Sequence, residues 1–109
     1  MHAHHKVSGE NARKLRKKGG AYLKKLRASS GLTQIELAEK TGFKYYTFIS
    51  QIENGAGRIP PNLYEAYAAA VDVERSEFVK NMLKFYDPYT YKALFGPAPK
   101  KKAAKKKAA

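Results

Sequence analysis

Apolar residues in the middle of the chain recur at intervals of three and four positions, which is the spacing of one face of an α-helix. This spacing predicts five short helices over residues 21–28, 33–42, 45–53, 61–71 and 74–86, and the sequence 89–95 adds another turn or two. No segment alternates between apolar and polar positions with the period of two that marks a strand. The pattern therefore predicts an all-α fold.

Local signals mark the ends of several of these helices. Thr33 is the expected N-cap of the second helix, and Glu36 stands three residues later as its capping-box partner. Gly42 and the pair Asn54-Gly55 are expected to end the second and third helices, because glycine adopts the left-handed conformation that helix ends often need. Asp87-Pro88 is expected to break the fifth helix.

Each helix has a set of apolar side chains, and we expect those of the third and fourth helices to be buried. In chain order these are Tyr22, Leu23 and Leu26; Ile35, Leu37 and Ala38; Tyr45, Phe48, Ile49 and Ile52; Leu63, Tyr67, Ala70 and Val71; and Phe78, Val79, Met82, Leu83 and Tyr86. At 100° per residue, the opposite face of the third helix carries Thr47, Ser50, Gln51 and Asn54, with Tyr46 at the boundary. Surface helices usually carry Lys and Glu there, so this uncharged, hydrogen-bonding face indicates a contact surface.

Charge divides the chain into three parts. The net charge is +13, of which residues 1–20 hold +5 and residues 97–109 hold +6, while residues 21–96 hold only +2. We expect a basic N-terminal arm over 1–20, in which a short helix at 11–18 is separated from the rest by Gly19-Gly20. Residues 21–96 form the domain with its C-terminal helical extension, and 97–109 form a disordered Lys-rich tail. The usual targets of such basic arms are nucleic acids or an anionic membrane surface.

Several function classes find no support in the sequence. The chain has no cysteine, which excludes disulfides and thiol catalysis. His2, His4 and His5 lie at one end, either as metal ligands or as remnants of an expression tag, and a disordered end is the favoured interpretation. No nucleophile, acid or histidine falls into a catalytic arrangement, so we expect neither an enzyme nor a cofactor. No apolar run is long enough to span a bilayer. We expect a cytoplasmic protein associated with the nucleoid.

The segment LRASSGLTQIELAEKTGFKYYTFISQIENG resembles the helix-turn-helix of the Cro/lambda-repressor-like family, often called XRE. The resemblance is carried by the order and spacing of four motifs. They are Leu26-Arg27, then Gly31-Leu32-Thr33-Gln34, then Leu37-Ala38-Glu39, and finally Ser50-Gln51-Ile52-Glu53-Asn54-Gly55. Farther on, YAAAVDV (67–73) is similar to the end of the family's fourth helix. The resemblance covers about residues 21–80.

This resemblance implies that the third helix lies in the major groove of double-stranded DNA while the second crosses the backbone. The residues expected to contact bases are Tyr46, Thr47, Ser50 and Gln51, and glutamine suits an adenine edge. Those expected to contact the DNA backbone are Gln34, Lys44, Tyr45, Asn54 and Arg58. Arg27 and Glu53 match a pair that joins the first helix to the end of the third.

One spacing departs from the family pattern. From Leu37 to Gly55 the chain is one residue longer than is common, and the surplus falls at 43–46. Either the turn bulges or the third helix begins later.

The leading functional hypothesis is a sequence-specific transcriptional regulator of bacterial or phage type, acting as repressor or activator. Two alternatives stay open: an architectural, nucleoid-associated protein, and an antitoxin-type autoregulator whose aromatic C-terminal region holds a protein partner. The aromatic segment 74–95 suggests either a second layer over the small core or, as the favoured interpretation, a homodimer interface. The lysine tail is expected to add non-specific phosphate contacts.

Overall fold

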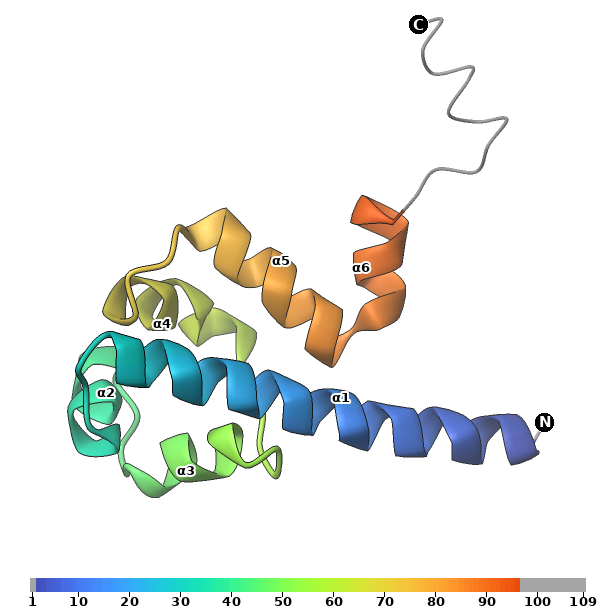
Figure 1. Ribbon diagram of the computed structural model, residues 1–109, viewed down its shortest axis with the longest axis horizontal. Coiled ribbons are helices and arrows are strands. Elements are labelled where there is room, and N and C mark those ends of the chain that lie inside the picture. The colour runs from blue at the N-terminus through green and yellow to red at the C-terminus, as the bar shows by residue number, and fades with distance from the viewer. Residues whose placement is uncertain (1, 97–109) are drawn as a thin grey trace, which may run out of the picture.

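The computed structural model describes residues 2–96, with side chains from Gly9 onward. The helices are α1 (His2–Ser29), α2 (Gln34–Thr41), α3 (Thr47–Glu53), the 3-10 turn η1 (Pro61–Leu63), α4 (Tyr64–Ala70), α5 (Arg75–Tyr86) and α6 (Pro88–Phe95). The described part of the chain contains no strand, which confirms the all-α prediction. In Figure 1, α3 lies on one side of the long helix α1, and α4 and α5 lie on the other.

The main departure from the predicted elements is in α1, which runs without interruption through Gly19-Gly20. The predicted break at this pair is wrong. Both glycines are buried where α1 crosses its neighbours: a Cβ on Gly19 would lie 2.9 Å from Cβ of Phe85 in α5. A Cβ on Gly20 would collide with the carbonyl oxygen of Glu53 and lie 2.8 Å from that of Ile52. Glycine is used here for close helix packing.

The start and end of α2 follow the sequence signals. The Thr33 hydroxyl accepts a hydrogen bond from the backbone N–H of Glu36 at 3.1 Å, and the Glu36 carboxylate accepts one from the N–H of Thr33 at 2.9 Å. Gly42 adopts the left-handed conformation with φ +86° and donates to the carbonyl of Ala38. The capping box and the glycine stop are both confirmed.

The extra residue between α2 and α3 lengthens the connection between them, because α3 begins at Thr47 rather than at Tyr45. A single turn precedes the helix, in which Phe48 N–H donates to the carbonyl of Tyr45 at 3.1 Å. Of the two alternatives that the spacing left open, the later start is the one observed.

The core gathers side chains from α1 to α5 around fully buried aromatic and aliphatic residues. Its largest members are Tyr67, Phe78, Leu23, Leu37, Ile49, Ile59 and Met82. Ile59, in the loop before η1, and Ala68, in α4, were not predicted as core residues.

Two residues predicted as buried are exposed, Tyr45 at 55% and Phe48 at 42%. Ile35, an apolar member of the second helix, is 54% exposed. The physical reason at Phe48 is the position of the buried side of α3, which centres on Ile49, Ile52 and Glu53. Phe48 therefore lies on the flank, where its ring packs against those of Phe43 and Tyr45.

The C-terminal elements extend the domain. Phe78 and Met82 of α5 belong to the same core. Asp87 then caps α6 by accepting a hydrogen bond from the N–H of Thr90 at 3.2 Å, which confirms the predicted extra helix. α6 packs on α5, and it leaves Tyr89, Leu94 and Phe95 exposed.

Candidate nucleic-acid interface

The outer face of α3 brings together the four side chains that the sequence predicts as base contacts. Tyr46, Thr47 and Gln51 are exposed and Ser50 is half-buried. All four carry neutral hydrogen-bonding groups, either hydroxyl or carboxamide. Such groups distinguish donor and acceptor patterns without adding charge, so this surface is suited to reading polar edges.

The residues predicted as backbone contacts lie at both ends of α3. Lys44 and Tyr45 are exposed in the turn before the helix, with the Lys44 Nζ 5.6 Å from the centre of the Tyr45 ring. Asn54 and Arg58 are exposed after it. The Arg58 guanidinium lies 5.1 Å from the ring centre of Tyr86 in α5, which restricts where that charge can reach.

Arg27 and Glu53 form an ion pair that ties α1 to the end of α3. Arg27 Nε lies 2.6 Å from Glu53 Oε2, and Nη2 lies 3.0 Å from Oε1. Arg27 Nη1 also donates to the carbonyl of Leu32 at 2.8 Å, which adds the loop before α2. The hydrogen bond to Glu53 raises the pKa of Arg27 above its usual value, against an opposing effect of burial. The pair is structural in its placement, because Glu53 is buried.

Gln34 has a contact that the sequence did not predict. Its Nε2 donates to Glu53 Oε1 at 3.1 Å, so the first residue of α2 joins the pair between Arg27 and Glu53. A carboxamide nitrogen carries two hydrogens, and this bond uses one of them. The resemblance implied only a phosphate contact for Gln34, because the proximity of α2 to the end of α3 depends on tertiary packing.

The loop after α3 is held by a set of hydrogen bonds. Asn54 Oδ1 accepts from the N–H of Ala56 at 2.9 Å, and the Gln51 carbonyl accepts from the N–H groups of Ala56 and Gly57 at 2.9 Å. The Ile59 N–H donates to the Tyr86 hydroxyl at 3.1 Å. Burial raises the pKa of that hydroxyl to about 12, so it stays protonated near neutral pH. The loop is thereby fixed to both α3 and α5.

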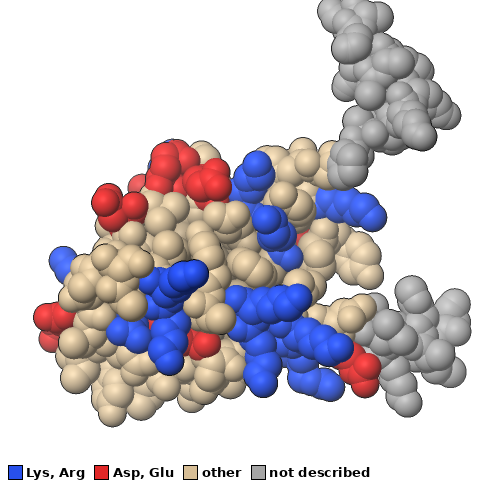
Figure 2. All heavy atoms as spheres, in the orientation of Figure 1, with Lys and Arg blue, Asp and Glu red and all other residues tan. Residues whose placement is uncertain are grey.

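Charge is unevenly distributed over the surface. Figure 2 shows Lys and Arg gathered over α1, whereas Asp and Glu gather at the start of α5. The exposed acids there include Asp72, Glu74 and Glu77. A polyanion is therefore attracted to the side of the molecule along α1.

Two other kinds of site find no support in the described residues. Where side chains are described, no group of three or more His, Cys, Asp or Glu residues is arranged to hold a metal ion. His2, His4 and His5 lie outside the described side chains, as does the Lys-rich tail 97–109. Within residues 2–96, no helix has both the length and the apolar character needed to cross a bilayer.

Comparison with known proteins identifies the domain. No curated protein matches the chain. A family model described as Helix-turn-helix matches residues 23–78, just over half of the chain, from Leu23 in α1 to Phe78 in α5. The match contains α2, α3, the loop that follows and the pair Arg27–Glu53. The chain belongs to the helix-turn-helix family of DNA-binding domains, of the Cro/lambda-repressor type.

Proposed function

We propose that this protein is a sequence-specific regulator of transcription that binds double-stranded DNA with α3 in the major groove. The observation that carries this proposal is the neutral, hydrogen-bonding outer face of α3, held in place by Arg27 and Gln34 through their bonds to Glu53. A face without Lys or Glu gains little from salt-dependent attraction. Its hydrogen-bonding groups instead favour some base edges over others.

The dimensions of α3 agree with this placement. An α-helix with its side chains is about 10–12 Å across, which fits the major groove of B-DNA at about 12 Å wide. With Tyr46, Thr47, Ser50 and Gln51 directed at base edges, the two ends of α3 approach the two backbone strands. Gln51 suits adenine, because its carboxamide donates and accepts on one edge.

The proposed backbone contacts lie where those strands would pass. Lys44 and Tyr45 would contact the strand near the start of α3. Asn54 and Arg58 would contact the strand near its end. Gln34 contributes its second amide hydrogen from the N-terminus of α2, where the helix dipole also favours a phosphate.

We further propose that the protein acts as a homodimer through residues 74–95. Tyr89, Leu94 and Phe95 on α6 are exposed apolar side chains that a second copy would cover. A twofold axis through this surface would present two α3 helices to half-sites about one DNA turn, roughly 34 Å, apart. The lysines of 97–109 would add phosphate contacts that do not depend on sequence.

The experiment is to select preferred duplexes from a random pool and to compare their dissociation constants with those of scrambled duplexes. We expect the selected duplexes to share one motif and to bind at least about 10³-fold more tightly at physiological salt. Equal binding of all duplexes would contradict sequence recognition and favour an architectural role.

A further inference from the structure

A second charged surface lies between the N-terminal half of α1 and the loop after α3. It is a groove of about 670 Å³. The residues that line it, which together we name the basic groove, are Glu10, Arg13, Lys14, Arg16, Lys17, Asn54, Gly55 and Ala56. The domain that the family model matches begins at residue 23, so five of the eight lining residues lie outside it.

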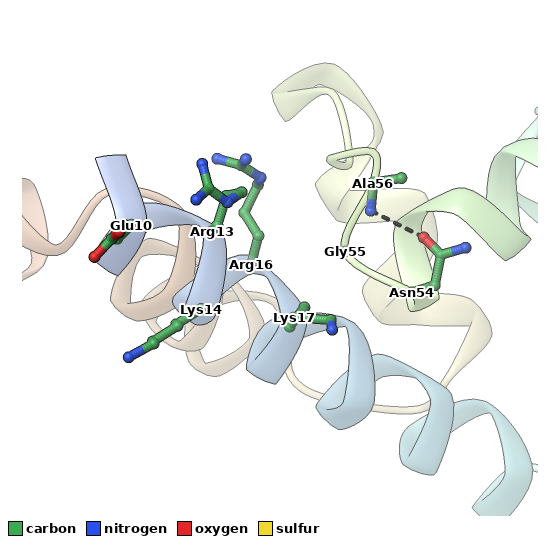
Figure 3. A pocket seen from close by; sticks show the side chains of 8 residues that line it. All are labelled: Glu10, Arg13, Lys14, Arg16, Lys17, Asn54, Gly55 and Ala56. Carbon is green, nitrogen blue, oxygen red and sulfur yellow. Dashed lines mark hydrogen bonds between the residues drawn. The ribbon is translucent and has the colours of Figure 1, made fainter. Parts of the chain in front are cut away.

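The floor of the basic groove is a close contact between two backbones. Gly55 has φ +86°, and a Cβ built on it would lie 2.9 Å from Cα of Lys17. Only glycine adopts this conformation readily and also allows so close an approach. The loop wall is fixed by the hydrogen bond between Asn54 and Ala56 (Figure 3), and the other wall is a continuous helix. The groove is therefore preformed.

Hydrogen-bond donors and positive charge dominate the walls. Figure 3 shows Arg13 and Arg16 extending from α1 on one side of the groove, with Ala56 on the loop across from them, and Lys17 on α1 below Asn54. Among the described residues the ion pairs are Arg27–Glu53 and Arg75–Glu65, so no carboxylate within 4 Å neutralises the groove cations.

Asn54 shapes this wall through its oxygen, which accepts a hydrogen bond from the Ala56 N–H, while Figure 3 shows its NH₂ group directed away from α1. Guanidinium and ammonium donors together form a binding site for a phosphate group.

The position of the basic groove points to DNA as the source of that phosphate. Asn54 comes directly after α3, and at 100° per residue it falls on the same side as Thr47 and Ser50. A polyanion that lies along the outer face of α3 therefore meets the groove at the end of the helix. Arg13 and Lys17 are one turn apart, about 6 Å along the axis of α1, which is close to the rise of two nucleotides at about 3.4 Å each.

We propose that the basic groove binds phosphates about two nucleotides apart on the DNA strand that flanks the segment contacted by α3. This inference rests on the proposed function and extends it. The N-terminal half of α1 becomes a rigid part of the DNA-binding surface, so the contacted DNA is longer than the helix-turn-helix alone requires.

The test uses the full chain with R13Q/R16Q, and K25Q/K40Q as a control that removes two exposed charges outside both the basic groove and residues 74–95. The slope of log K against log salt should fall by about 2 in the groove variant, at roughly 0.9 per phosphate contact. Preferred and scrambled duplexes should lose affinity by the same factor. The control should keep the wild-type slope, and melting curves of both variants should match that of the wild type.

Ethylation interference gives a second measurement on the wild type. We expect interfering phosphates beyond one edge of the preferred motif, and we expect this interference to disappear in R13Q/R16Q. An unchanged slope with unchanged interference would overturn the proposal, as would an equal fall in slope in the control variant.

A third measurement separates DNA from small phosphorylated ligands. If R13Q/R16Q abolished binding of tripolyphosphate and left the DNA slope intact, the groove would be a small-ligand site and the proposal would be wrong. The proposed function is judged separately, by the ratio of preferred to scrambled binding in the wild type. A ratio near one would contradict the proposed function even if the groove binds DNA. A high ratio would support the proposed function even if the groove does not bind DNA.

Discussion

At the scale of single residues, Glu53 has the largest structural role in the candidate site. It is buried, and it receives hydrogen bonds from Arg27 and Gln34, so one carboxylate connects α1, α2 and the end of α3. The resemblance implied the pair with Arg27 but not the bond from Gln34. The reason is that a family pattern records which residue types recur, whereas the bond depends on how closely α2 approaches α3.

Glu53→Ala should lower the stability of the domain because it leaves the Arg27 guanidinium partly buried without its partner. Loss of one member of such a pair costs about 3 kcal/mol. At roughly 4–8 °C per kcal/mol for a domain of this size, the melting temperature should fall by more than about 10 °C. Circular dichroism melting measures the change.

Glu65→Ala is the matched control, because Glu65 and Arg75 form an exposed pair at 3.4 Å. Its stability should change by less than about 1 kcal/mol. If the two variants melted at the same temperature, the pair between Arg27 and Glu53 would contribute no more than a surface contact.

At the scale of elements, α1 differs most from what the sequence indicated. Glycine usually weakens a helix interior, and two in succession predicted a break. The packing overrides that preference, because Gly19 and Gly20 face α5 and the end of α3 respectively. The ends of α2 and the end of α5 were predictable, because Thr33, Gly42 and the pair Asp87-Pro88 act through their own neighbours in sequence.

The periodicity of apolar residues predicted most of the core, but it predicted the wrong buried residues where a helix is short. Phe48 and Tyr45 were expected to be buried from a helix that started at Tyr45. With α3 reduced to seven residues, the buried face is narrower and both aromatic rings lie outside it. The outer face of α3 was predictable, since Thr47 and Gln51 oppose Ile49 and Ile52 in any register counted back from Glu53.

Gly20→Ala tests the role of the glycine pair in helix packing. Although alanine favours a helix by about 1 kcal/mol, the added methyl would collide with the Glu53 carbonyl, and overpacking costs about 1–3 kcal/mol or more. We expect net destabilisation in urea unfolding. Gly9→Ala is the control: it meets no atom within 4 Å, so it should stabilise the protein slightly. If Gly20→Ala were as stable as Gly9→Ala, α1 would not be closely packed against the end of α3.

At the scale of the whole molecule, the exposed apolar residues of α6 lead to a prediction about assembly. Leu94 is 63% exposed, so Leu94→Glu should leave the fold intact while placing a charge in the proposed interface. Sedimentation should show a dimer for the wild type and a monomer for this variant. The control is Ala69→Glu, at an exposed position of α4, and this variant should remain dimeric. A monomeric wild type in the presence of DNA would remove the basis for two half-sites.

The lysine tail leads to a prediction about non-specific affinity. Deleting residues 100–109 should weaken binding to preferred and scrambled duplexes by similar factors, because lysines carry charge without sequence information. The slope of log K against log salt should fall by up to about 5 if all six lysines meet phosphates at roughly 0.9 each. A slope that did not change on deletion would mean that the tail stays solvated.

The central claim is that neutral side chains on α3 distinguish base sequences while basic residues elsewhere hold the backbone. The most direct measurement compares the ratio of preferred to scrambled binding, together with the salt slope, for the wild type and for T47A/Q51A. Each well-made base contact is worth about 1–3 kcal/mol of discrimination, so the double substitution should lower the ratio by about 30-fold or more. The salt slope should stay nearly constant, and so should the melting temperature, because both residues are exposed. The account would be contradicted if T47A/Q51A kept the wild-type ratio of preferred to scrambled binding and lowered the salt slope instead.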